Sequence, residues 1–194
     1  MSRTTIFAII FLSASVVSAQ KKYSGPKCLG PFCIYSDIST TTLWKHLGSP
    51  PKRSSHLSPY CFQSEDGRAF LYVETIDSEP DVPDEVLVSD SPNCLHMPKA
   101  VTRDNLNAWK TPEGVGIGSS EQDVLKAYGK PSDRKIIDWL TYRFVIRGYR
   151  PNDGDLSLGD EYLFYNGDTD NDLSAAEFGI RKGKVSYVWL SDSE

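Results

Sequence analysis

Three kinds of side chain in this sequence could carry chemistry: the histidines, the cysteines and a run of aspartates near the C-terminus. His46, His56 and His96 lie in the first half of the chain. The nearest pairing with a nucleophile is that of His56 with Ser54, Ser55 or Ser58, in a proline-flanked loop. The sequence contains neither a Gly-x-Ser-x-Gly nucleophile turn nor a His-x-x-x-His metal pair. We therefore interpret the histidines as surface residues and predict no catalytic residue and no cofactor.

The aspartates stand at alternate positions, as in the first half of a calcium-binding loop, where a hard cation needs several oxygen ligands. They are Asp168, Asp170 and Asp172. Leu173 stands where an EF-hand has its turning glycine, and Gly179 where it has its bidentate glutamate. This excludes an EF-hand. We interpret the run as a solvated acidic loop, with a looser cation site as the alternative.

The N-terminal 19 residues have the three parts of a cleavable secretory signal: Arg3 near the start, an apolar run over 6–17, and small residues at Val17 and Ala19. A membrane anchor is disfavoured because this run is shorter than the roughly 20 apolar residues that span a bilayer. The last seven residues form no hydrophobic tail for glycolipid anchoring. The sequence predicts a signal peptide over 1–19 and a secreted protein, periplasmic or extracellular, without a stable membrane anchor.

Four cysteines, Cys28, Cys33, Cys61 and Cys94, form an even set, which in an exported chain indicates two disulfides. Three pairings are possible. We favour Cys28 with Cys33, because they are close along the chain, and Cys61 with Cys94, because they bracket one β-like stretch. A zinc site is the alternative, but paired C-x2-C knuckles and a neighbouring histidine are missing from the sequence. We predict no metal site.

Composition limits the class of protein and of partner. The 194 residues are 39% hydrophobic and 24% charged, which is typical of a globular protein and not of a fibrous or disordered one. Lys and Arg number 21 against 26 Asp and Glu, a net charge of −5. Nucleic-acid binding driven by bulk positive charge is therefore not expected.

The elements that would position these residues show a weak internal repeat. Residues 39–50 and 120–131, which are 81 positions apart, place Ser, Lys, Gly and Pro at the same offsets. In the second segment Ser119 or Ser120 can cap a helix, an apolar stripe follows over 124–128, and Gly129 with Pro131 can end the helix. We predict two copies of one unit, over residues 20–100 and 101–194.

Hydrophobic residues alternate after each predicted helix, which indicates β-strands. The predicted strands cover residues 68–76, 85–88, 139–147, 161–165 and 184–190, with a hairpin turn at 181–184. The predicted fold class is α+β: two tandem copies of a short helical segment, each packed on an antiparallel β-sheet.

The string from Gly118 to Pro131, followed by a meander and preceded by a degenerate copy, resembles the repeat of the β-lactamase inhibitory proteins and of the small outer-membrane lipoproteins of the β-barrel assembly machinery. The resemblance implies a curved antiparallel sheet whose concave face binds another protein. The sequence departs from the assembly lipoproteins, since no lipid-anchor cysteine follows the signal. No residue matches an inhibitory contact one by one, so a β-lactamase target does not follow.

The predicted outward face of the second sheet carries aromatic and arginine side chains, which are enriched at the centres of protein interfaces. These residues are Trp139, Arg143, Arg147, Tyr187 and Trp189. The alternatives are that they cover the sheet beside the helix, or that the two faces are reversed, because a one-residue slip inverts a strand. We predict a secreted module that binds another protein, for example as an inhibitor or an adaptor. A small secreted hydrolase with its site between the two repeats and a cell-envelope structural protein are the alternatives.

Overall fold

The computed structural model describes residues 25–34, 47, 60–76, 79–91, 100–102, 106–136, 160–166 and 174–192. The predicted signal peptide, the three histidines and the aspartate run 168–172 lie outside these residues, as does the predicted strand over 139–147. No helix in the described part of the chain has the length and apolar character needed to cross a membrane.

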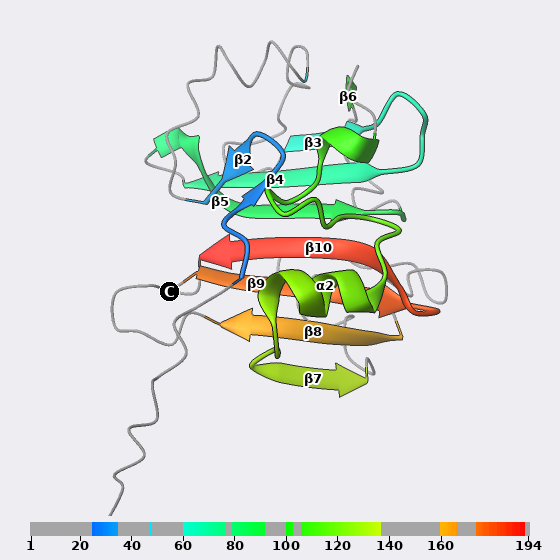
Figure 1. The fold of residues 1–194 in the computed structure, drawn as a ribbon. Coiled ribbons are helices and arrows are strands. Elements are labelled where there is room, and N and C mark those ends of the chain that lie inside the picture. Colours follow the sequence, from blue (N-terminus) through cyan, green and yellow to red (C-terminus); the bar gives the residue numbers. More distant parts are fainter. Residues whose placement is uncertain are drawn as a thin grey trace, which may run out of the picture.

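The described strands form a two-stranded sheet and an eight-stranded sheet (Figure 1). The small sheet is the hairpin of β1 (Cys28–Leu29) and β2 (Phe32–Cys33). The large sheet has the order β6-β3-β4-β5-β10-β9-β8-β7, and all of its neighbours are antiparallel except β3 and β6, which are parallel. Its strands are β3 (Tyr60–Gln63), β4 (Phe70–Ile76), β5 (Glu79–Ser89), β6 (Ala100–Val101), β7 (Asp133–Ile136), β8 (Glu161–Asn166), β9 (Ser174–Arg181) and β10 (Lys184–Asp192).

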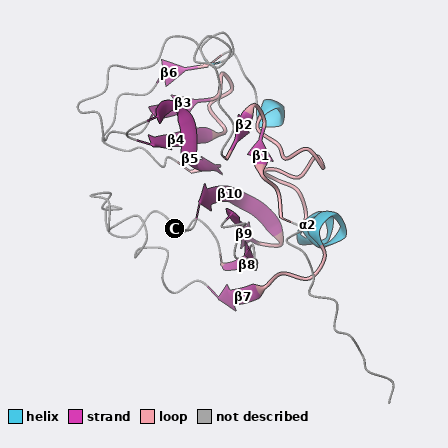
Figure 2. Ribbon diagram, turned by 90° about the vertical axis from the view of Figure 1, so that its left-hand side faces the viewer, coloured by secondary structure: helices cyan, strands magenta, loops and turns pink. Residues whose placement is uncertain are grey.

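One face of the large sheet is covered by α2 (Glu121–Tyr128), the 3₁₀ turn η1 (Leu106–Ala108) and the β1–β2 hairpin, as the side view in Figure 2 shows. The core lies between these elements and the sheet, with Val124 and Tyr128 of α2 packed among buried side chains such as Phe178 and Val188. Tyr128 stacks on Phe178 with ring centroids 5.4 Å apart. This face is therefore the inner face of the sheet.

The predicted helix is confirmed, and its ends have the predicted causes. The Ser120 hydroxyl accepts from the Asp123 backbone N–H at 3.2 Å, and the Asp123 carboxylate accepts from the Ser120 backbone N–H at 2.8 Å, which forms a capping box. The hydrogen bonds from Ser120 also lower the pKa of Asp123. Gly129 ends the helix with φ of +75°, a conformation that a residue with a Cβ rarely adopts.

Four of the predicted strands are confirmed in type, as β4, β5, β8 and β10. The predicted hairpin turn between β9 and β10 is also present, with φ of +52° at Lys182 and +71° at Gly183, the two left-handed residues of a type I′ turn. β9 was not predicted from the sequence, although Ala176, Phe178 and Ile180 of the core alternate along it with Glu177 and Gly179 on the other face.

The predicted fold class, two tandem helix-on-sheet copies, is wrong. The described residues form a mostly β structure with a single short α-helix, α2, on one continuous sheet. The strands before and after α2 are joined into one sheet by the pairing of β5 with β10, so they do not form two separate helix-on-sheet units. The repeat rested on Ser, Gly and Pro, which are common at helix ends and carry no information about strand pairing. Its first segment, residues 39–50 with the first predicted helix, lies outside the described residues except for Leu47.

Candidate functional site

The centre of the large sheet is the antiparallel pairing of β5 with β10, which joins the strands within residues 60–101 to those within residues 133–192. Val86, Val88, Val188 and Leu190 from this pairing belong to the core under α2. Because side chains alternate along a strand, the residues between them point to the opposite face. We call this opposite side the seam face. Its residues on β4, β5, β9 and β10 are Tyr72, Glu74, Glu85, Leu87, Ser89, Glu177, Gly179, Tyr187 and Trp189.

Two of the five residues predicted to bind a partner lie on the seam face. Tyr187 is opposite Ser89 on one side and Gly179 on the other, and Trp189 is opposite Leu87 and Glu177. Tyr187 is 1% exposed, whereas Trp189 is half-buried. Trp139, Arg143 and Arg147 lie outside the described residues. The partner-binding role of all five stays a prediction.

The ring of Tyr187 is packed directly on Gly179. A Cβ built on Gly179 would lie 1.8 Å from Cε1 and 2.0 Å from Cδ1 of Tyr187, so only glycine allows this approach. The Tyr187 hydroxyl then donates to Oε1 of Glu177, which is 8% exposed. A buried carboxylate needs such donors, and the glycine therefore positions an ordered polar pair next to Trp189.

Two further glutamates on the seam face are held by aromatic donors in the same way. The indole Nε1–H of Trp189 donates to Oε1 of Glu85 at 2.7 Å, across the seam from β10 to β5. The hydroxyl of Tyr72 donates to Oε2 of Glu74 at 2.7 Å, along β4. Glu74 and Glu85 are themselves direct partners in the β4–β5 ladder. The seam face thus combines aromatic rings with carboxylates whose orientation is fixed.

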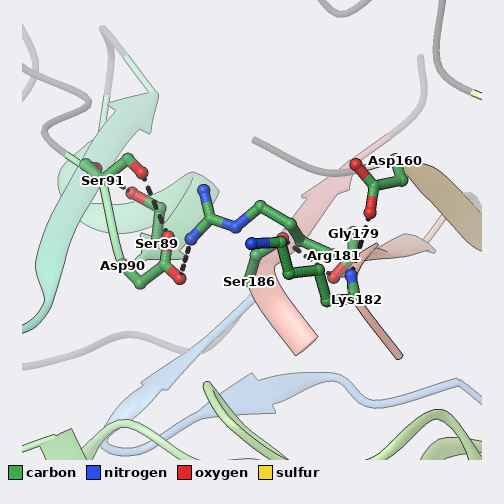
Figure 3. Close-up of polar contacts among 8 residues, drawn as sticks. All are labelled: Ser89, Asp90, Ser91, Asp160, Gly179, Arg181, Lys182 and Ser186. Atoms are coloured by element: carbon green, nitrogen blue, oxygen red, sulfur yellow. Dashed lines mark hydrogen bonds and ion pairs between the residues drawn. The ribbon is translucent and has the colours of Figure 1, made fainter. Parts of the chain in front are cut away.

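One end of the seam is closed by a cluster of polar contacts (Figure 3). The Arg181 guanidinium, at the end of β9, forms an ion pair with Asp90, which follows β5. The Asp90 backbone N–H donates to the Ser186 carbonyl at 2.9 Å, and the Ser186 hydroxyl donates to the Gly179 carbonyl at 3.3 Å. In the hairpin turn, the Lys182 backbone N–H donates to Asp160 at 2.9 Å. These contacts fix the register of β5, β9 and β10 beneath the seam face.

A separate cleft of about 570 Å³ lies between the end of α2 and β7. It is lined by Leu125 and by residues Gly129–Arg134. The Arg134 guanidinium is shared by two carboxylates, Glu121 at 2.9 Å and Glu161 at 3.0 Å, and the hydrogen bond to Glu161 followed by the charge of Glu121 raises the pKa of Arg134. The Arg134 guanidinium is therefore engaged within the protein.

The first predicted disulfide, Cys28–Cys33, is present and joins directly opposed residues of β1 and β2. Cys61 is also disulfide-bonded. Its predicted partner, Cys94, lies outside the described residues. Within the described ranges, no three His, Cys, Asp or Glu side chains are grouped as metal ligands would be.

Sequence reasoning singled out Trp189 and Tyr187 as residues of one sheet face, but it missed the glutamates that accept hydrogen bonds from them. The alternation of β4 already placed Tyr72 and Glu74 on one face, so that pair was accessible to sequence reasoning. Trp189 and Glu85 are 104 positions apart, and their contact depends on the β5–β10 pairing. No local sequence signal specifies that pairing.

Comparison with known proteins gives one structural likeness. No protein-family model matches the chain, and no curated protein matches it. Among solved structures, the chain is similar to the crystal structure of a DUF4309 family protein (YjgB) from Bacillus subtilis subsp. subtilis str. 168. The TM-score is 0.41 and the sequence identity 8%, over 84% of this chain and 82% of that chain. A likeness at this level assigns neither a family nor a function.

Proposed function

We propose that this chain is a secreted binding protein that engages another protein through the seam face, with Trp189 at the centre of the contact. The observation that carries the proposal is the set of three aromatic–carboxylate hydrogen bonds, Tyr72 to Glu74, Trp189 to Glu85 and Tyr187 to Glu177. One of them runs along β4, one crosses from β10 to β5 and one joins β10 to β9.

Such an arrangement favours binding because side chains that are already ordered lose little entropy when a partner arrives. Trp189 has the size and the polar N–H that make tryptophan common at interface hot spots. It is half-buried, so part of the ring remains accessible while its indole N–H is fixed on Glu85. Tyr187 is buried and acts as the support that keeps Glu177 in place.

The test is affinity capture from the native extracellular or periplasmic fraction, followed by measurement of the dissociation constant with the purified partner. Trp189→Ala should weaken binding about 30-fold, the effect of a hot spot worth about 2 kcal/mol. Gln122→Ala is the matched control, because Gln122 is exposed on α2, on the other side of the sheet. It should bind as the wild type does.

Each variant is checked for folding by near-ultraviolet circular dichroism. A folded Trp189→Ala variant that binds with unchanged affinity refutes the proposed face. Catalytic turnover of a hydrolase substrate by the wild type, lost in Glu85→Gln, would instead favour an enzyme.

A further inference from the structure

We propose that the Cys28–Cys33 disulfide is a redox-sensitive switch: its reduction by a dithiol raises the population in which the β1–β2 hairpin leaves the inner face of the large sheet. The hairpin lies on the side of the sheet opposite the seam face (Figure 2). The inference therefore goes beyond the proposed binding function and does not depend on it.

The first argument is the weak backbone attachment of the hairpin. Among the described strands, β1 and β2 have two residues each and pair only with each other, outside the large sheet. A two-stranded hairpin is at best marginally stable alone. The Gly30 N–H donates to the Lys110 carbonyl oxygen at 2.7 Å and links the hairpin to the segment after η1. Side-chain burial and the disulfide must supply the rest of the stability.

The second argument is the effect of the disulfide on that balance. Leu29 and Phe32 are 0% exposed and belong to the hydrophobic core. The disulfide joins residues five positions apart, and closing so short a loop favours the ordered hairpin about 30-fold over the open chain. After reduction, the burial of two large side chains has to offset the entropy of ordering the whole hairpin. The open population should therefore rise by the same factor.

The third argument is access. Cys28 and Cys33 are half-buried, so solvent reaches this disulfide. Cys61, which belongs to another disulfide, is 0% exposed. Thiol–disulfide exchange requires a thiolate to reach a sulfur atom, so its rate depends on access. A dithiol should therefore reduce Cys28–Cys33 before it reduces the disulfide of Cys61.

The fourth argument is a buried donor next to the hairpin. A Cβ built on Gly30 would lie 3.4 Å from the Trp109 Cα, so the two backbones are close. Trp109 is 0% exposed, and its indole N–H has no acceptor within the described part of the chain. A buried donor without an acceptor destabilises the closed arrangement, because water bonds to the same N–H when it is exposed. Opening relieves this penalty, and the disulfide opposes opening.

The chemistry is a two-electron exchange. One thiolate of the dithiol attacks a sulfur of the disulfide and forms a mixed disulfide, and the second thiolate then displaces the protein sulfur. The dithiol is oxidised to a disulfide, and its two protons end on the thiols of Cys28 and Cys33. The Cys-x-x-Cys pairs of thiol–disulfide oxidoreductases are dithiols of this class. The reverse exchange restores the closed hairpin.

The experiment uses the full ¹⁵N-labelled chain and dithiothreitol. Thiols formed at increasing dithiothreitol are alkylated and located by mass spectrometry, and Cys28 and Cys33 should be modified at a concentration that leaves Cys61 unmodified. At that concentration the Gly30 amide, which is bonded to Lys110, should exchange with D₂O about 30-fold faster. The amides of the β5–β10 ladder should keep their protection. Cys28→Ser/Cys33→Ser should show the same exchange without reductant.

Gly30→Ala tests the docking of the hairpin without changing a cysteine. The added Cβ would lie 2.3 Å from the Ala108 carbonyl oxygen, so the hairpin must move away from η1, and Cys28–Cys33 should be reduced at least fivefold faster. Gly114→Ala is the matched control. Gly114 also has a positive φ, +82° against +58°, but a Cβ there would have nothing within 4 Å. This variant should be reduced at the wild-type rate.

Three results would overturn the switch. Alkylation of Cys61 at the same dithiothreitol concentration as Cys28 would show that the hairpin disulfide is not selectively reducible. Unchanged protection of the Gly30 amide after reduction would show that the disulfide does not control the hairpin. Equally faster exchange in the β5–β10 ladder would show global unfolding instead of release of the hairpin.

Discussion

The substitution Gly179→Ala tests the packing that supports the seam face. The added Cβ would lie 1.8 Å from Cε1 of Tyr187, far inside van der Waals contact, so the ring must move. Tyr187 is 1% exposed and its hydroxyl donates to Glu177, so a shift of the ring disturbs a buried hydrogen bond. The backbone of Gly179 has no positive φ, so alanine causes no backbone strain and the ring contact is the dominant effect.

The expected loss of stability follows from three contributions. Overpacking of a buried site costs about 1 to 3 kcal/mol. Loss of a hydrogen bond to a charged group costs about 1.5 to 3 kcal/mol. Replacing glycine by alanine within a strand stabilises the fold by about 0.5 to 1 kcal/mol, because alanine loses less conformational freedom on folding. We expect Gly179→Ala to lower the free energy of unfolding by about 2 to 4 kcal/mol.

The assay is urea unfolding of four proteins: the wild type, Gly179→Ala, Tyr187→Ala and the double variant. In the Tyr187→Ala background the ring is gone, and Gly179→Ala should then cost less than about 0.5 kcal/mol, the usual limit for independent sites. If the alanine costs the same in both backgrounds, the contact between Tyr187 and Gly179 does not determine the stability of this face.

Three further predictions concern the other side of the sheet. Cys28→Ser/Cys33→Ser should lower the free energy of unfolding by about 2 kcal/mol, because the unfolded chain gains entropy when the short loop is no longer closed. Thermal unfolding without reductant measures this loss. Ser120→Ala should cost about 1 kcal/mol through loss of the helix cap, whereas Ser120→Asp, which keeps an acceptor, should cost less. Burial, followed by the charge of Glu121, raises the pKa of Tyr165 to about 12 from its usual value of 10. The unfolded chain therefore loses this proton first, so stability is complete below pH 10 and falls as the pH rises from 10 to 12. The loss is about 1 to 2 kcal/mol after allowance for partial solvent access, and Tyr165→Phe should show a smaller decline in alkaline urea titrations. An equal decline in both proteins would contradict the assigned pKa.

The local elements could be predicted from the sequence because their causes are local. The helix over Glu121–Tyr128 has its cap at Ser120 and its stop at Gly129, within one turn of its ends. The turn at Lys182–Gly183 needs only two residues that tolerate positive φ. In contrast, β9 is buried on both faces, and Ala175 and Gly179 stand at two of the positions opposite the core, so its alternation of apolar and polar residues is weak.

The overall fold could not be predicted because it depends on which strand edges meet. A helix cap recurring 81 residues apart suggested two separate units, but backbone hydrogen bonds between β5 and β10 make one sheet of both halves. No pattern of side chains in the sequence indicates which two strands form those backbone hydrogen bonds. The predicted domain boundary between residues 100 and 101, and the resemblance to the β-lactamase inhibitory proteins, stay predictions.

Among the described residues, two polar side-chain contacts link the β5 side of the seam to β9 and β10, and they lie toward opposite ends of it. Arg181 and Asp90 pair at one end, and Trp189 and Glu85 meet near the other. Between them, the ladder from Tyr187–Ser89 to Ser191–Glu85 holds the strands together through the backbone. Removing the charge of Glu85 therefore leaves the ladder and the Arg181 ion pair in place. Because glutamine still accepts from the Trp189 indole, Glu85→Gln changes the charge of the seam face without changing the sheet beneath it. A Glu85→Gln variant that keeps the near-ultraviolet circular dichroism of the wild type but loses binding therefore reports on recognition and not on folding.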